Sequence, residues 1–160
     1  MKLDLAIEEL HRSENDLAGQ LLAVSDRHKA DHEVFHVARD IARWSQRHVR
    51  ELAHIGRDHG LGLDPEPPQD PGLLERVRQS ASDLFGRRSE PGLLLLADLR
   101  HVHREAAGVS LDWELLALAA QGSRQRELFD LARRCHPDTL RQMKWANAKL
   151  KESATQALVS

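Results

Sequence analysis

Apolar residues recur at alternating steps of three and four along most of this chain, which is the period of one face of an α-helix. A short turn separates the first two runs. They read Leu3, Ala6, Leu10, Glu14, Leu17, Leu21, Val24 and then Val34, Val37, Ile41, Trp44/Ser45, His48, Leu52, Ile55. Two helices of this length joined by a short turn are expected to pack side by side as an antiparallel hairpin.

The composition also favours a helical protein. The 160 residues include no tyrosine, three phenylalanines and three tryptophans, and leucine, alanine, arginine and glutamate predominate. Such a chain is poor in the aromatic and β-branched residues that strands favour. At this length a chain can bury a continuous core without disulfides, so we expect a single domain over residues 1–160.

Proline and glycine divide this helical material into two hairpins and a connector. The first hairpin is expected over residues 3–58 and the second over residues 91–158. Between them, residues 59–90 include four prolines that cannot continue a helix, which predicts a semi-rigid crossover. A connector of this length can travel the length of a bundle. The sequence therefore predicts an all-α four-helix bundle with one long crossover.

The later elements have their own boundary signals. Asp70-Pro71 would cap a short amphipathic helix inside the crossover, with Gly86 as its end. Glu90-Pro91 opens helix three, whose stripe is Leu95, Leu99, Val102, Ala106, Val109, Trp113, Leu116, Ala120. Helix four is expected to kink or restart at His136-Pro137, because proline removes a backbone donor. Beyond that point its predicted stripe is Leu140, Met143, Asn147, Leu150, Ala154, Leu158.

A glutamate and a histidine occupy central positions of the first two stripes, where a structural helix would carry leucine. They are Glu14 and His48. A carboxylate and an imidazole projecting from facing helices are two of the ligand types with which helical bundles hold metal ions. The same groups can instead form a buried hydrogen-bonded pair, which would cost about 3–5 kcal/mol to break. We favour the structural pair over a working metal site.

The order of elements, the short helix in the crossover, the internal Glu14 of EELHRSENDL and the stretch SQRHVREL around His48 resemble the ferritin-like superfamily. The branch they resemble is the small bacterial stress-associated one typified by the YciE/YciF proteins. In that superfamily two helices each contribute a glutamate and two each contribute Glu-x-x-His, which together hold two iron or manganese ions. The resemblance implies that Glu14 is the helix-one glutamate and His48 the histidine of the helix-two motif.

The chain departs from that ligand set. Ser45 stands where the glutamate of the helix-two motif belongs, and helix four has no carboxylate between Asp138 and Glu152 and no histidine after His136. A site that needs four carboxylates and two histidines keeps one of each. We therefore expect a degenerate metal site in a protein without turnover of its own, which acts in binding, assembly or a stress response. No cofactor is expected on this interpretation.

The competing class is a metal-dependent oxidoreductase, or a metal-binding protein with a reduced ligand set. In that alternative Glu14 and His48 hold iron, manganese or zinc with help from Asp112, Glu114 or Asn147. The number of acids on the core stripes distinguishes the two classes, and the small number found favours a degenerate metal site without turnover.

The remaining histidines suggest a third alternative, a helical interaction module that senses pH or metal. His32 and His36 stand four apart, with His28 one turn earlier. They could clamp zinc or nickel, but we favour a solvated helix start because no acid or thiolate completes the set. His136, directly before Pro137, is interpreted as a helix-cap or kink residue.

Charge and cysteine usage limit the partners and the compartment. The 25 acidic and 23 basic residues are spread along the chain, which leaves no concentrated basic surface for nucleic acid. No apolar run or signal-peptide pattern predicts membrane association. The one cysteine, Cys135, fits a buried thiol in a reducing cytoplasm. We expect a homodimer or another protein partner, with the run Leu93–Leu96 covering a dimer seam or the crossover helix.

Overall fold

The computed structural model describes residues 2–67, 69 and 90–160, and these residues form four helices and no strand. The helices are α1 (Lys2–Arg27), α2 (His32–Asp58), α4 (Pro91–Gly122) and α5 (Arg126–Val159). The prediction of an all-α, four-helix protein is confirmed. The short helix predicted between Asp70 and Gly86 lies outside the described residues.

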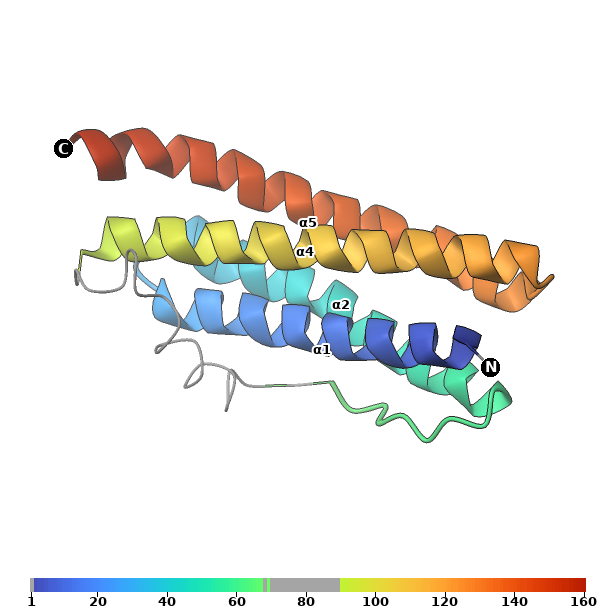
Figure 1. Ribbon diagram of the computed structural model, residues 1–160. Coiled ribbons are helices and arrows are strands. Elements are labelled where there is room, and N and C mark those ends of the chain that lie inside the picture. Colours follow the sequence, from blue (N-terminus) through green and yellow to red (C-terminus); the bar gives the residue numbers. More distant parts are fainter. Residues whose placement is uncertain (1, 68, 70–89) are drawn as a thin grey trace.

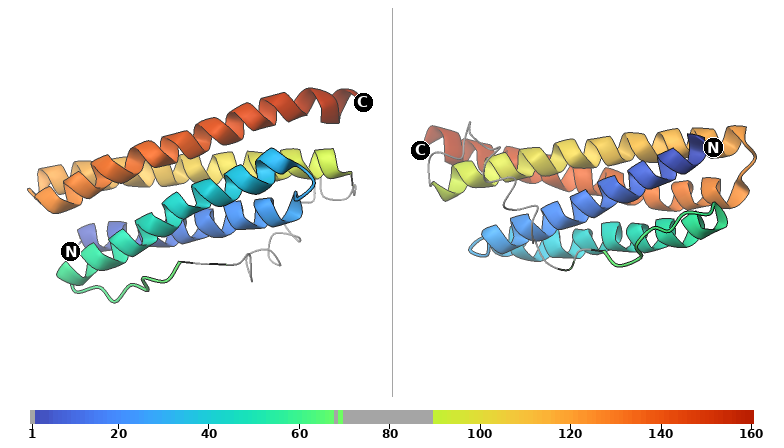
Figure 2. Two further views of the ribbon diagram at one scale, coloured as in Figure 1. Left: turned by 180° about the vertical axis from the view of Figure 1, so that it is seen from behind. Right: turned by 60° about the horizontal axis from the view of Figure 1, so that its bottom comes forward.

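The helices form a bundle of two antiparallel hairpins, α1 with α2 and α4 with α5 (Figure 1). The helix α1 packs on α4, while α2 lies against α5 through a sparser interface. The end of α2 and the start of α4 lie at opposite ends of the bundle (Figures 1 and 2). Residues 59–90 therefore connect the two ends, and α2 and α4 run in the same direction.

The start of the crossover follows the outer side of α1. His59 Nδ1 lies 3.2 Å from Asp4 Oδ1, and His11 Nε2 lies 2.8 Å from the carbonyl oxygen of Asp64. Leu63 packs over Gly56 of α2, close to the position that a Cβ would take there. These contacts fix the described part of the crossover along the first hairpin.

The apolar stripes predicted for the first three helices face the core. All the predicted stripe positions of α4 are buried, as are those of α1 except Ala6 and those of α2 except Val37 and Trp44. The helix α2 is capped by Asp31, the residue before its first turn, whose carboxylate accepts a hydrogen bond from the Val34 backbone N–H at 3.1 Å. The strict three- and four-residue spacing is sufficient to place these three helices.

The prediction for the last helix was wrong in its buried face, and the restart that it allowed at Pro137 does not occur. The helix α5 continues through Pro137 without a restart. Its buried face also differs from the predicted stripe, because Leu140 is 46% exposed and Leu158 is 62% exposed. The residues of α5 that are buried are Leu128, Leu131, Ala132, Cys135, Thr139, Gln142, Ala146, Lys149.

The physical reason is that one proline interrupts a long helix only locally. Pro137 removes one backbone donor, while residues on both sides of it stay packed in the core. The helical register therefore passes unchanged from Cys135 to Thr139 and Gln142. In this register Asp138 faces α2 and contacts His48 and Arg47, at a position for which no functional role is predicted from the sequence.

Candidate functional site

Glu14 and His48 meet in the middle of the bundle. Both side chains are fully buried, and His48 Nδ1 lies 2.8 Å from Glu14 Oε1. Each residue arrives there because it occupies a core position of its helix, between apolar neighbours one turn away on either side. The structure therefore brings together the two residues that the sequence had singled out.

A second carboxylate lies on the opposite side of the His48 ring. Asp138 Oδ2 of α5 is 3.1 Å from His48 Nε2. The imidazole is thus held between two carboxylates, one from α1 and one from α5. Asp138 was missed in the sequence because helix four had been assigned the wrong buried face.

Trp113 of α4 completes this central group. Its indole Nε1 donates a hydrogen bond of 2.7 Å to the same Glu14 Oε1 that contacts His48. Its ring also packs edge-on against the imidazole, with centroids 5.6 Å apart and an interplanar angle of 83°. Glu14, His48, Trp113 and Asp138, here called the central group, thus come from all four helices.

The two carboxylates differ in their surroundings. Arg47 Nη2 lies 2.8 Å from Asp138 Oδ2, and Arg141 Nη1 lies 2.8 Å from Asp138 Oδ1. Asp138 is therefore a partly exposed acid between two arginines and the buried His48. Glu14 Oε2, by contrast, is buried without a hydrogen-bond partner among the described residues.

The pKa of His48 is raised above its ordinary value. Burial alone would lower this pKa, but the hydrogen bonds and negative charges of Glu14 and Asp138 together outweigh it. A protonated imidazole has a donor on each ring nitrogen, which matches a carboxylate on each side. The two carboxylates therefore favour the protonated form of the His48 imidazole.

This shift predicts how stability depends on pH. Because the pKa of His48 is higher in the folded chain, its contribution to stability is complete below about pH 6.5 and is lost as the pH rises through the folded value. We expect the free energy of unfolding in urea to fall as the pH rises above about 6.5. His48→Gln should remove this part of the pH dependence, whereas the exposed-histidine variant His36→Gln should keep it. Identical pH profiles for the wild type and His48→Gln would contradict the assignment.

Next to the central group, polar residues fill the place where the resemblance requires a further glutamate. Gln142 Nε2 donates hydrogen bonds to Ser45 Oγ and to the carbonyl oxygen of Ile41, both at 2.9 Å. Ser45 and Gln142 are both buried. A neutral amide and a hydroxyl therefore pair with each other at this position, and neither supplies a negative charge.

The metal-binding alternative also requires Asp112, Glu114 or Asn147 to assist Glu14 and His48. The two acids among them contact other side chains instead. Ser13 Oγ donates a hydrogen bond of 2.7 Å to Asp112 Oδ2, and Glu114 Oε1 lies 3.6 Å from His136 Nε2. No hydrogen bond joins these acids or Asn147 to Glu14 or His48 in the described part of the chain.

The remaining histidines form separate contacts. The rings of His32 and His36 touch, with centroids 4.4 Å apart, and both residues are exposed. His28 does not join them, because it is buried and its Nε2 lies 2.7 Å from Asp98 Oδ2. His136 is not a cap but an internal residue of α5, with Nε2 2.8 Å from Ser110 Oγ.

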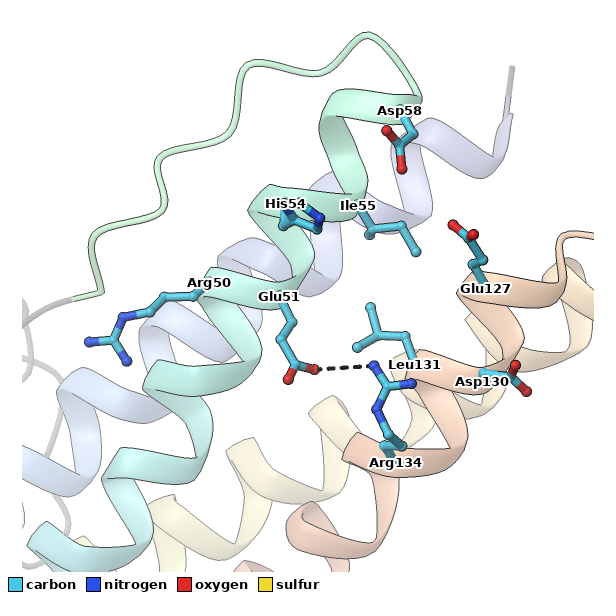
Figure 3. Close-up of a pocket in the computed structure, with 9 residues that line it drawn as sticks. All are labelled: Arg50, Glu51, His54, Ile55, Asp58, Glu127, Asp130, Leu131 and Arg134. Atoms are coloured by element: carbon cyan, nitrogen blue, oxygen red, sulfur yellow. Dashed lines mark ion pairs between the residues drawn. The ribbon is translucent and has the colours of Figure 1, made fainter.

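A groove of about 520 Å³ opens between α2 and α5, beside the central group. Figure 3 shows Glu51 and Arg134 facing each other across it, 3.7 Å apart, with Ile55 and Leu131 on its floor. Cys135 Sγ lies 3.5 Å from Glu51. Burial and this acid raise the pKa of the Cys135 thiol well above its usual range, so the thiol stays protonated.

The central group does not fit a metal centre of the kind that the resemblance implies. Both nitrogens of His48 already face carboxylate oxygens, and two guanidinium groups already neutralise Asp138. Across residues 2–67, 69 and 90–160, no set of three or more His, Cys, Asp or Glu side chains is placed to hold a metal ion. An additional cation would also lie close to the Arg47 and Arg141 guanidinium groups, which already pair with Asp138.

Comparison with known proteins gives no match to this chain among family models, curated proteins or solved structures. None of the helices in the described residues combines the length and the apolar character that crossing a membrane requires. Function must therefore be inferred from the residues themselves.

Proposed function

We propose that this protein is a non-catalytic, ferritin-like helical bundle that acts in binding or assembly, with a stress-associated role as the resemblance implies. In it, the Glu14–His48–Asp138 group takes the place of a di-metal centre. The observation that carries the proposal is that His48 has both ring nitrogens bonded to carboxylates, at 2.8 Å and 3.1 Å. A metal-ligating histidine offers one nitrogen to the ion, so one of these contacts would have to be given up.

The neighbouring residues support this interpretation. Trp113 occupies the centre of α4 as a fully buried side chain, and it uses its one donor on Glu14. Beside it, Gln142 Nε2 donates a hydrogen bond to Ser45 Oγ, while Gln142 Oε1 is buried without a partner among the described residues. The interior is therefore filled by packed and hydrogen-bonded side chains, which stabilises a bundle but leaves no carboxylate pair to bridge two ions.

One observation favours the second candidate, a metal-binding protein or metal-dependent oxidoreductase with a reduced ligand set. Glu14 Oε2 is buried without a hydrogen-bond partner among the described residues, and a buried carboxylate oxygen is costly to leave unpaired. A water molecule would satisfy it, and so would a metal ion.

The metal content of the purified protein distinguishes the two candidates. We expect protein purified without a histidine tag or chelator to contain far less than one equivalent of iron, manganese or zinc per chain. It should also stay folded and take up no added iron, and Glu14→Ala should leave the metal content unchanged. Near-stoichiometric metal that disappears in Glu14→Ala would instead establish the metal-binding candidate.

A further inference from the structure

The helix α4 carries a second apolar stripe on the side that faces away from the core. Leu111, Leu115 and Leu118 follow one another at steps of four and three, and they are 59%, 62% and 66% exposed. Val109, Trp113 and Leu116, on the opposite side of the same helix, are buried. A helix that is apolar on both sides is normally covered on both sides.

The neighbouring helix extends this outer face. The helix α5 packs beside α4, as the contact between Ser110 and His136 shows, and it presents Leu140 at 46% exposure. Six of the seven exposed large apolar side chains in the described part of the chain lie on the α4/α5 hairpin, and four of these, Leu111, Leu115, Leu118 and Leu140, form this outer face. An exposed cluster of this kind typically marks an interaction surface.

Gly108 belongs to the same stripe, one step before Leu111. A glycine inside a helix lowers helix stability relative to alanine, so it usually has a packing reason. A Cβ added to Gly108 would meet nothing within 4 Å. The packing of the chain itself therefore does not require a glycine there, whereas close approach of a second helix would.

The outer stripe is complementary to itself in an antiparallel arrangement. When two copies of α4 cross in opposite directions about a point level with residue 113, Leu118 of one copy meets Gly108 of the partner subunit. In the same register Leu111 meets Leu115 of the partner subunit. Each large side chain then contacts either a leucine or the space above a glycine, as a two-fold interface requires.

The acidic and basic side chains beside the stripe can also pair between two copies of the chain. Glu114 and Arg133 line a hollow of about 450 Å³ between α4 and α5, together with Leu118. The Arg133 guanidinium lies 5.8 Å from the centre of the Phe129 ring and has no carboxylate partner among the described residues. Among the described residues, Glu114 forms an ion pair with His136, whose Nε2 lies 3.6 Å from Glu114 Oε1. Two-fold symmetry would place Glu114 of each copy beside Arg133 of the partner subunit.

From these observations we infer that two copies of this chain form a two-fold dimer through the outer face of the α4/α5 hairpin, with the two α4 helices antiparallel. This inference rests on the proposed assembly function and names its surface. The central group lies inside the bundle and the proposed interface lies on its outer face. Metal binding at the central group and dimer formation can therefore be measured separately.

Sedimentation velocity over a range of concentrations tests the dimer. The wild-type chain should sediment with twice its mass of 18.1 kDa. Leu115→Glu should weaken dimer formation by about tenfold or more, because it places a charge at the centre of the apolar stripe. The matched control is Leu158→Glu, since Leu158 has the same exposed fraction of 62% but lies near the end of α5; it should remain a dimer.

Two further variants separate the interface from folding. Gly108→Leu adds a side chain in open space and favours the helix, so it should stay folded and lose the dimer. Glu114→Arg should weaken the dimer, and adding Arg133→Glu should restore it. A wild-type monomer at all concentrations, or a dimer that neither Leu115→Glu nor Gly108→Leu weakens, would overturn the inference. If the wild-type protein is a monomer that contains no metal, this inference is overturned, whereas the proposal of a non-catalytic bundle without a metal centre is not.

Discussion

Replacing His48 by alanine is expected to lower the free energy of unfolding by about 3–5 kcal/mol. The substitution leaves the fully buried Glu14 without its cationic partner, and it takes a contact from Asp138. Glu14→Ala should cost a similar amount, because it leaves His48 Nδ1 and the Trp113 indole N–H without an acceptor. Urea unfolding followed by circular dichroism at pH 6 measures both.

The control for this prediction is His32→Ala, which changes an exposed histidine at the start of α2 and should shift stability by no more than about 0.5 kcal/mol. If His48→Ala, Glu14→Ala and His32→Ala lowered the free energy of unfolding equally, the buried Glu14–His48 pair would contribute no more to stability than an exposed histidine. A second comparison separates breaking the pair from replacing it. The double variant Glu14→Leu/His48→Met removes both charges together and should recover much of the loss, since the cost lies in the unpaired charge.

The part of the fold that could be predicted is the part with uninterrupted three- and four-residue spacing. On α1, α2 and α4 the apolar steps continue across each helix, and most of the predicted residues are buried. Glu14 and His48 could be identified for the same reason, because a polar residue in an otherwise apolar stripe must be buried if the stripe is. No long-range information was needed for these positions.

Asp138 could not be found in this way, because the assumption about Pro137 reset the register of the last helix. A proline removes one hydrogen bond, and in a long helix the packing on both sides outweighs that loss. Carrying the spacing of Leu128, Leu131 and Cys135 through the proline would have predicted Thr139 and Gln142 in the core. Because Thr139 and Gln142 are polar, apolar spacing alone does not select that face.

Other contacts depend on pairs that are far apart in the sequence. His28 is buried because Asp98 of α4 lies 2.7 Å from its Nε2, and nothing near His28 in the sequence indicates this partner. The outer leucines of α4 show the converse case. Periodicity selects the covered face of that helix, but it does not indicate what packs on Leu111, Leu115 and Leu118.

Trp113→Ala is expected to lower the free energy of unfolding by about 3–5 kcal/mol, because it leaves a cavity where α4 meets the central group. Trp113 is fully buried, and its ring packs against His48. Trp113→Phe keeps most of the volume but removes the 2.7 Å hydrogen bond to Glu14. It should cost about 1–3 kcal/mol, since hydrogen bonds to charged groups are among the stronger ones. Both values can be measured by urea unfolding followed by circular dichroism, which does not depend on the indole fluorescence that these substitutions remove.

The chain provides a matched control in Trp145 of α5. Its indole Nε1 is also buried but has no hydrogen-bond partner among the described residues. Trp145→Phe therefore removes a donor without removing a bond, and it should change stability little or raise it slightly. If Trp113→Phe and Trp145→Phe shifted stability equally, the bond to Glu14 would contribute nothing. A large loss for Trp113→Phe alone would show that the hydrogen bond from Trp113 to Glu14 stabilises the central group.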